Sequence, residues 1–233
     1  MESIKTMKNW RTRLRSLVGR DPNMAPRLCY SQDGEDLFLD RLIDGAPTGF
    51  YIDVGAHHPV RFSNTYMFYL RGWRGINIDA QPGSMDPFRR LRPRDINLEC
   101  GVGVAAGILP YYQFNEPALN TFDRAEAELK DTPPYRIVDR IEVAMRRLDA
   151  LLDEHLPAGQ AIDFLTVDVE GKDLEVLESN NWQRYRPRLV LAETLRTELL
   201  NLSACPLVRF LAEQGYRPTG KTYNTTFFER IEP

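Results

Sequence analysis

Residues 51–56 (YIDVGA) decide the fold class of this chain. The segment starts with apolar and β-branched residues, typical of a buried strand, and it ends with an acid and a glycine, typical of a turn. In open α/β sheets, ligands bind beyond the carboxyl ends of the strands. The segment therefore predicts a strand over 50–54 whose end, at Asp53 and Gly55, borders a binding site.

From Gly49 onward, apolar runs alternate with segments of helical spacing. This alternation predicts an α/β fold, a mainly parallel sheet with helices on both faces. We expect strands over 50–54, 75–79, 96–102, 162–169, 188–193 and 223–231. We expect helices over 64–70, 82–91, 148–156, 174–179 and 206–214.

Residues 107–135 depart from this rhythm. Residues 107–114 predict an added strand, and residues 115–135 form a long insertion that ends in Pro133-Pro134. Long loops inside compact domains are often lids over functional sites. We therefore interpret 107–135 as a candidate acceptor-binding loop within a single domain over 26–233.

The bulk properties restrict the class of protein. The 233 residues suffice for one domain with a large core, and a net charge of -3 argues against nucleic acid as the main partner. No apolar run is long enough to span a bilayer. The basic start is also not followed by the apolar stretch of a secretory signal. These two features predict a cytoplasmic protein. Three well-separated cysteines suit reduced thiols.

The first 25 residues form a basic arm. Its cationic side chains are Lys5, Lys8, Arg11, Arg13, Arg15 and Arg20. Two interpretations remain open. The arm is either solvated or a contact in a homo-oligomer, or it attaches the protein peripherally to an anionic surface or partner.

The predicted strands end in acids, and the first turn does not suit a phosphate-bearing cofactor. A dinucleotide site needs the turn G-x-G-x-x-G, which is absent here. Asp79 lies 24 residues after Gly55, where its carboxylate could accept both hydroxyls of an adenosyl ribose. These features predict S-adenosylmethionine as the cofactor. The expected contacts are Asp53, Gly55, Asp79, Ala80, Gly101 and Asp168.

Methyl transfer to a weakly acidic acceptor requires a base, and the sequence offers two kinds. His57 and His58 follow the first strand, and their alternative role is to cap backbone groups. Glu170 lies beside Asp168, and with Glu193 these acids could bind Mg²⁺, which would acidify the acceptor. Alternatively, Glu170 or Asp173 favours the start of a helix and Glu193 pairs with Arg196. Asn120, Thr121 and Tyr223 offer polar and aromatic contacts for a sugar.

Several segments resemble the FkbM family of methyltransferases. They are YSQDGEDLFL (30–39), GFYIDVGAHHP (49–59), SNTYMFYLRGWRGINIDAQP (63–82), LNTF (119–122), IDFLTVDVEGKDLEVL (162–177) and residues 188–193. The resemblance implies a Rossmann-like class I fold and methylation of a hydroxyl oxygen. It also implies that Ser31 and Gln32 cover the methionine end of the cofactor, although Ser31 could instead be a helix N-cap. Asp79 stands where the family more often has Glu.

These observations predict an S-adenosylmethionine-dependent O-methyltransferase. The expected acceptor is a hydroxyl of a nucleotide sugar, a polysaccharide or lipopolysaccharide glycan, or a glycosylated natural product, with Mg²⁺ as a candidate aid. One alternative is a scaffold that has lost catalysis, which the retained acids argue against. Another is an NAD-dependent enzyme, which the missing phosphate turn argues against.

Overall fold

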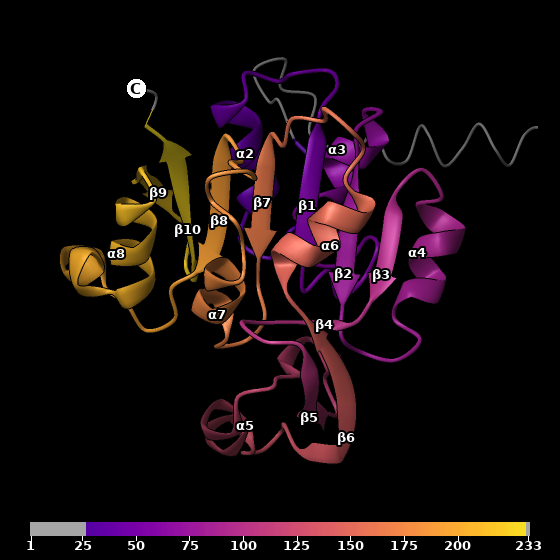
Figure 1. Ribbon diagram of the computed structural model, residues 1–233. Coiled ribbons are helices and arrows are strands. Elements are labelled where there is room, and N and C mark those ends of the chain that lie inside the picture. The colour runs from indigo at the N-terminus through magenta and orange to yellow at the C-terminus, as the bar shows by residue number, and fades with distance from the viewer. Residues whose placement is uncertain (1–26, 232–233) are drawn as a thin grey trace, which may run out of the picture.

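A seven-stranded sheet is the central layer of the protein (Figure 1). The computed structural model describes residues 27–231, so the basic arm lies outside the described residues. The strand order is β3-β2-β1-β7-β8-β10-β9. These strands are β1 (Phe50–Val54), β2 (Arg74–Asp79), β3 (Ile96–Glu99), β7 (Phe164–Val167), β8 (Leu189–Glu193), β9 (Tyr216–Lys221) and β10 (Thr225–Arg230). Neighbours from β3 to β8 are parallel, and β10 is antiparallel to both β8 and β9.

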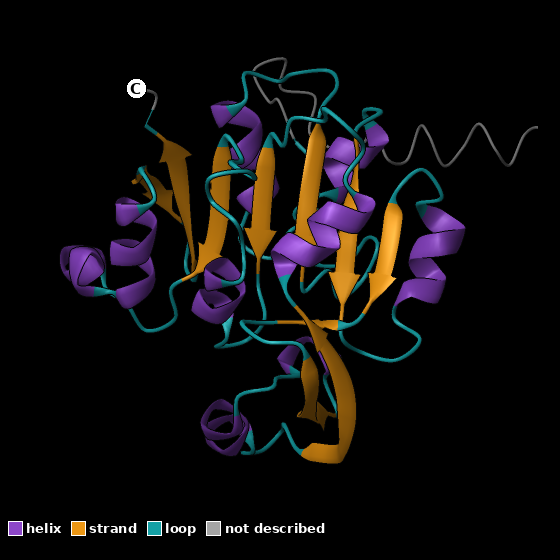
Figure 2. Ribbon diagram, viewed as in Figure 1, coloured by secondary structure: helices purple, strands orange, loops and turns teal. Residues whose placement is uncertain are grey.

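Helices cover both faces of this sheet (Figure 2). One face carries α2 (Glu35–Leu42) and α3 (Tyr66–Leu70). The other carries α6 (Leu148–His155), α7 (Asp173–Glu178) and α8 (Pro206–Glu213). The helix α4 (Met85–Leu91) lies beside β3, and a 3-10 helix, η2 (Leu199–Ala204), precedes α8. The predicted α/β fold, mainly parallel and covered on both faces, is confirmed.

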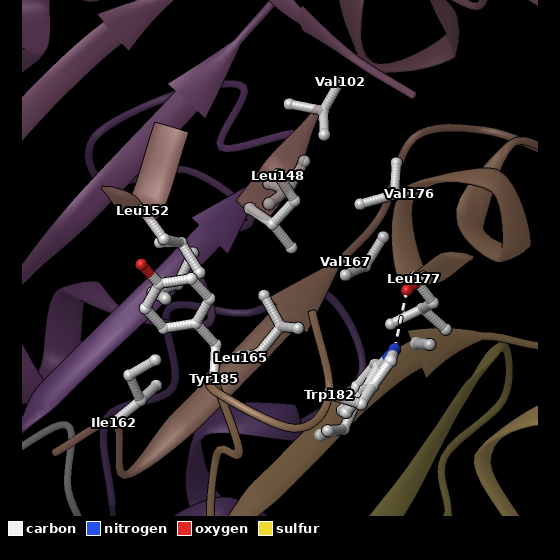
Figure 3. Packing of buried hydrophobic residues seen from close by; sticks show 14 of the residues in the cluster. Val102, Leu148, Leu152, Ile162, Leu165, Val167, Val176, Leu177, Trp182 and Tyr185 are labelled. Atoms are coloured by element: carbon white, nitrogen blue, oxygen red, sulfur yellow. Dashed lines mark hydrogen bonds between the residues drawn. The ribbon is translucent and has the colours of Figure 1, made fainter. Parts of the chain in front are cut away.

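Side chains alternate between the two faces of the central strands. Tyr51 and Phe164 pack toward α2 and α3, while Ile52 and Leu165 pack toward α6 and α7. Figure 3 shows the second of these clusters, in which Trp182 donates a hydrogen bond of 2.8 Å to the Leu177 carbonyl. Because both faces are buried, the strands read as continuous apolar runs.

A second, three-stranded sheet follows the order β4-β6-β5. Its strands are β4 (Gly101–Val102), β5 (Gly107–Phe114) and β6 (Ile137–Arg146), and a 3-10 helix η1 (Pro117–Leu119) and α5 (Arg124–Lys130) lie between β5 and β6. Figure 1 shows this sheet beyond the carboxyl ends of β1, β2 and β7. The chain leaves the main sheet at Cys100 and enters the small sheet with β4, and β6 ends beside β4, where the Gly103 N–H donates to the Arg146 carbonyl at 3.0 Å.

The strand predictions were wrong in three places. The single strand expected over 96–102 is two strands, β3 and β4, which belong to different sheets because the chain leaves the main sheet at Cys100. The strand β6 was missed, although its apolar residues alternate. The strand β9 was also missed, since it contains Pro218 and Gly220, which disfavour strands.

Among residues 27–231, no helix is long and apolar enough to cross a membrane. The cysteines Cys29, Cys100 and Cys205 are all free thiols. Burial raises the pKa of the Cys100 thiol to about 11, so at neutral pH it is protonated. This agrees with the expectation that these cysteines carry no disulfide.

Candidate active site

A cavity of about 240 Å³ lies between the carboxyl ends of β1, β2 and β7 and the small sheet. It brings together nine of the predicted site residues, namely Gly55, His57, His58, Asp79, Ala80, Gly101, Asn120, Asp168 and Glu170. Six others do not line it, namely Ser31, Gln32, Asp53, Thr121, Glu193 and Tyr223. The lining also includes Val102, Tyr111 and Phe122 from the segments around the small sheet, and we refer to this space as the strand-end cavity.

Gly55 brings the turn after β1 against the backbone of β7. Its φ is +85°, and a Cβ at this position would lie 1.7 Å from the Asp168 carbonyl oxygen. An expected contact with the cofactor is therefore not the first reason for a glycine at this position. A side chain at this position would collide with the protein's own backbone at Asp168. The glycine thus allows the ends of β1 and β7 to lie in contact at the cavity.

Asp79 closes β2 and faces the cavity. One carboxylate oxygen accepts the His57 N–H and the other accepts the Gln81 N–H, each at 2.8 Å. Burial raises the pKa of Asp79, and these two backbone N–H groups partly offset that shift. Each carboxylate oxygen can accept a second hydrogen bond. Asp79 can therefore hold two ligand hydroxyls while it fixes the loops that follow β1 and β2.

Asp53 does not line the cavity but binds a neighbouring segment. Its carboxylate accepts a hydrogen bond of 2.7 Å from the Thr65 hydroxyl, and burial raises its pKa to about 6. Thr65 also accepts from Arg92, which forms an ion pair of 2.9 Å with Asp95. Both charged side chains are fully buried. Asp53 therefore orients the segment that contains Thr65, while its contact with the cofactor stays a prediction.

The Arg92–Asp95 pair was missed by sequence reasoning. Arg92 also donates to the Tyr51 hydroxyl at 2.7 Å, and that hydroxyl donates to Asp95 at 2.7 Å. This network holds the segment around Thr65 against the main sheet. The stretch RPRD at 92–95 reads as an exposed turn, and no local pattern distinguishes it from one.

His58 caps the backbone of its own loop. Its Nδ1 accepts hydrogen bonds from the N–H groups of Val60, at 3.1 Å, and Arg61, at 2.9 Å. Two donors at Nδ1 require the neutral ring to carry its proton on Nε2. Burial also lowers the pKa of His58. A ring in this state has no free lone pair for a substrate proton, so the geometry favours the capping alternative over a catalytic base.

His57 lines the cavity with a strained backbone, at φ +53°. Its Nε2 lies 3.4 Å from the Arg61 guanidinium, which can only donate. Burial is the largest cause that lowers the pKa of His57, and the charge of Arg61 lowers it further. The bond from its backbone N–H to Asp79 therefore indicates a structural role at the end of β2.

We expect His58→Asn to keep at least about half of the methyl-transfer rate, because an Asn side-chain oxygen can accept the same backbone N–H groups. His58→Ala should instead lower the free energy of unfolding by about 1–2 kcal/mol through the unpaired donors. Steady-state rates and urea unfolding would measure both effects. A fall of about a hundredfold in kcat for the asparagine variant, with unchanged stability, would restore His58 as a base.

The loop after β1 is clasped to η1. Arg61 forms a paired contact with Glu116, at 3.0 and 3.1 Å, and its guanidinium lies over the Phe62 ring at 4.1 Å from the centroid. Pro117 and Ala118, which follow Glu116, line the cavity. The Arg61–Glu116 contact therefore joins two segments that both line the cavity.

The LNTF segment lies across the cavity and is fixed at both sides. The Asn120 side chain donates to Gln81, after β2, at 2.9 Å. The Thr121 hydroxyl donates to the Glu170 carbonyl, after β7, at 2.8 Å. Asn120 lines the cavity, whereas Thr121 is fully buried and serves the backbone. Tyr223 lies on the turn between β9 and β10 and is 84% exposed.

Carboxyl groups crowd the ends of β7 and β8. Burial and the neighbouring Glu193 and Glu170 hold the pKa of Asp168 well above its usual range, and Asp168 donates a hydrogen bond to Glu193. Burial and nearby acids raise the pKa of Glu193 to about 8. Burial also raises the pKa of Glu170, although Lys130 contacts its carboxylate directly and opposes the shift. At neutral pH Glu193 therefore largely keeps its proton.

These carboxyls do not form the expected metal site. Lys130 is bound to Glu170, and Asp168 and Glu193 share a hydrogen bond. Among residues 27–231, no group of three His, Cys, Asp or Glu side chains is arranged to hold a metal ion. The alternative pairing of Glu193 with Arg196 is also not formed, because Arg196 pairs with Glu126 at 2.8 Å.

Ser31 and Gln32 precede α2 and lie outside the lining of the cavity. The Ser31 hydroxyl donates to the Asp36 carboxylate at 2.9 Å and accepts the Asp36 N–H at 3.2 Å. The N-cap of α2 is Gly34, so the alternative with Ser31 as N-cap is wrong in position. Ser31 nevertheless fixes the first turn of that helix, while contact of Ser31 and Gln32 with a cofactor stays a prediction.

Comparison with known proteins places these residues in a family. The methyltransferase FkbM domain matches residues 53–218, which include every residue that lines the strand-end cavity. The chain belongs to the FkbM methyltransferase family. The resemblance noted in the sequence is thereby confirmed.

The FkbM chain is also similar to individual proteins. Methyltransferase sdnD from Sordaria araneosa is 32% identical over 111 residues, which cover 38% of this chain and 43% of that protein. Two solved methyltransferase structures align over most of both chains. A TehB-like enzyme from Corynebacterium glutamicum has 12% identity and a TM-score of 0.40 over 96% of this chain and 97% of its own. Precorrin-6y C5,15-methyltransferase from Geobacter metallireducens has 14% identity and a TM-score of 0.39 over 88% and 90%.

Proposed function

We propose that this FkbM protein transfers the methyl group of S-adenosylmethionine to a hydroxyl oxygen of a sugar. The observation that carries the proposal is that one cavity holds both Asp79 and Glu170. Asp79 is a carboxylate at a strand end with lone pairs free for ribose hydroxyls. Glu170 is a carboxyl group whose pKa is raised toward neutrality.

The strand-end cavity has an apolar part and a polar part. Ile78, Val102 and Phe122 provide apolar contacts next to Asp79, which suits an adenine ring beside its ribose. Bound S-adenosylmethionine supplies a methyl group that its sulfonium has already activated. The protein therefore has to align the acceptor oxygen with that methyl carbon and to receive one proton.

Glu170 is the base in this proposal. An effective general base has a pKa near the working pH, and burial moves Glu170 in that direction. As the acceptor oxygen would bond to the methyl carbon, the carbon–sulfur bond would break and release S-adenosylhomocysteine, and the Glu170 carboxylate would take the hydroxyl proton. The positive charge of Lys130, which contacts Glu170, stabilises the ionised carboxylate, so that Glu170 can be deprotonated before the reaction. Neither histidine has a comparable free acceptor atom.

Polar side chains at the rim support a sugar as the acceptor. Gln81, Asn120 and Lys172 line the cavity together with the aromatic ring of Tyr111. Amide and ammonium groups bind hydroxyls, and an aromatic ring packs on the apolar face of a sugar. A divalent cation is not part of the proposal, because Lys130 already supplies the positive charge at Glu170.

The test is methyl transfer from labelled S-adenosylmethionine to nucleoside diphosphate sugars and to oligosaccharides. We expect a methyl ether as the product and a turnover that a chelator does not change. Glu170→Gln should lower kcat by at least about a hundredfold while cofactor affinity stays within about threefold.

Glu178→Gln is the matched control, since Glu178 is exposed on α7 and does not line the cavity. It should leave kcat unchanged. Transfer to amine acceptors and to no hydroxyl would overturn the choice of acceptor. Full activity of Glu170→Gln would remove Glu170 as the base.

A further inference from the structure

The helix α5 is held against the main sheet by ionic contacts. Of its apolar side chains only Ala127 is buried, so apolar packing contributes little to its position. Its N-cap residue, Asp123, lies 3.5 Å from the Lys172 ammonium, and its last residue, Lys130, contacts Glu170. Figure 1 shows α5 below α7, the helix that follows the loop with both of these partners. The place of Lys130 beside the proposed base therefore depends on charged side chains.

Glu126 lies at the centre of these contacts. Its carboxylate accepts hydrogen bonds from both terminal nitrogens of the Arg196 guanidinium, at 2.8 and 3.0 Å, and it lies 3.2 Å from the Lys130 ammonium. Burial opposes its charge, but the hydrogen bonds from Arg196 and Lys130 outweigh burial and lower the pKa of Glu126. Four charged side chains thus form one ionic network, in the order Arg196, Glu126, Lys130 and Glu170.

The ionic network runs from the surface to the proposed base. The Arg196 side chain is 59% exposed, whereas those of Lys130 and Glu170 are each 17% exposed. Arg196 follows β8 and Glu170 follows β7, and both have a left-handed backbone at φ +55°. The main sheet therefore supplies the two ends of the network, and α5 supplies its two middle members.

Two carboxylates compete for Lys130. The ammonium contacts Glu170 and also lies 3.2 Å from Glu126. Arg196 satisfies Glu126 with a paired contact, which leaves the ammonium available to Glu170. Within the described residues, Arg196 and Lys130 are the ion-pair partners of Glu126. Without Arg196, Glu126 would therefore draw the ammonium away from Glu170.

We propose that Arg196 is a positioning residue, which keeps Lys130 on Glu170 by occupying Glu126. Arg196 does not line the strand-end cavity, so it acts on Glu170 mainly through the two side chains of α5. The inference rests on the proposed function, because it concerns how the proposed base is held in its ionised form.

Loss of Arg196 should raise the pKa of Glu170. Burial already raises this pKa, and Lys130 is the main charge that opposes the shift. An ammonium drawn toward Glu126 opposes it less, and the charge of Arg196, which also lowers the pKa of Glu170, is gone. Glu170 should then ionise at higher pH. The other titratable groups that face Glu170 are unchanged, namely Tyr111 on β5, Asp168 after β7, Asp173 on α7 and Glu193 on β8.

The titration of Glu170 tests the proposal without any acceptor. In the full chain with isotope-labelled glutamate, nuclear magnetic resonance follows the Glu170 carboxyl, which is the signal that Glu170→Gln removes. We expect the titration midpoint at higher pH in Arg196→Gln than in the natural protein. Arg196→Lys should be intermediate, because lysine keeps the charge but not the paired contact. Arg124→Gln is the matched control, since it removes the same charge from a position on α5 that is 78% exposed, and it should leave the midpoint unchanged.

A double variant separates positioning from a merely structural contact. Arg196→Gln combined with Glu126→Gln removes the guanidinium together with the carboxylate that competes for Lys130. The Glu170 midpoint should then return toward that of the natural protein. The loss of a structural contact would not be repaired by the loss of its partner, so a structural role predicts no such return.

Turnover is measured on the same variants. Arg196→Gln should lower the ratio of kcat at about pH 6 to kcat at about pH 9 by at least about threefold, and the double variant should restore it. Shifted midpoints without any methyl transfer would remove the proposed function and leave the control of Glu170 by Arg196 standing. The proposal is overturned if Arg196→Gln leaves the Glu170 midpoint in place, if Arg124→Gln moves it equally, or if the double variant moves it further.

Discussion

Gly55→Ala is expected to lower the free energy of unfolding by more than about 4 kcal/mol, or to prevent folding. A Cβ at this position would lie 1.7 Å from the Asp168 carbonyl oxygen and 3.3 Å from the Val169 side chain. The backbone of β7 cannot retreat, since it is paired with β1 on one side and β8 on the other. A positive φ adds a conformational penalty of about 1 kcal/mol for any residue with a Cβ. Urea unfolding followed by circular dichroism would measure the change.

Gly83→Ala separates the two causes. Gly83 has a similar φ, +77°, but a Cβ there would meet nothing within 4 Å. We expect a loss of only about 1 kcal/mol, which is the conformational penalty alone. Equal losses in the two variants would contradict the assignment of Gly55 to the contact between β1 and β7.

Asp79→Ala is expected to weaken S-adenosylmethionine binding by at least about a hundredfold. A carboxylate that accepts two ribose hydroxyls contributes about 1.5–3 kcal/mol per hydrogen bond, and the loss of both corresponds to that factor or more. The variant also leaves the N–H groups of His57 and Gln81 without their acceptor, which loosens both loops. Calorimetry with the cofactor would measure the affinity.

Two further variants make this result specific. Asp79→Glu keeps the charge and should bind within about tenfold of the natural protein. Asp86→Ala removes an exposed acid from α4, where it pairs with Arg89, and should not change the affinity. Binding by Asp79→Ala within about threefold of the natural protein would show that the ribose is held elsewhere.

The sequence predicted the central strands well for a physical reason. A strand buried on both faces must be apolar throughout, so residues 50–54 and 189–193 are recognisable without any partner. The edge was different. β9 contains Pro218 and Gly220 and is determined by pairing with β10, including a bulge at Phe227, which no local pattern encodes. The break at Cys100 likewise depends on where the small sheet lies.

The candidate site was predictable where it depends on strand ends and not where it depends on contacts distant in sequence. Asp79 ends β2 and Asp168 follows β7, the two parallel strands that flank β1, so topology alone brings both acids to the same end of the sheet. The state of His58 depends on the amides of Val60 and Arg61, and that of Glu170 on Lys130, which lies 40 residues away. Contacts of this kind become visible only in the folded chain.

The path of the chain through the small sheet has an evolutionary consequence. Gly103 and Arg146 are hydrogen-bonded neighbours, so the segment between them begins and ends at one point, where β4 and β6 pair next to the main sheet. Its length and composition can drift, or be replaced by a graft from a relative, with little effect on the closure of the main sheet. Asp79 and Gly55 lie outside this segment, whereas Asn120, Phe122 and Lys130 lie inside it. Apart from Phe122, the proposed donor contacts can therefore stay constant while the proposed acceptor contacts diversify, and chimaeras joined at Gly103 and Arg146 are a direct route to new acceptors.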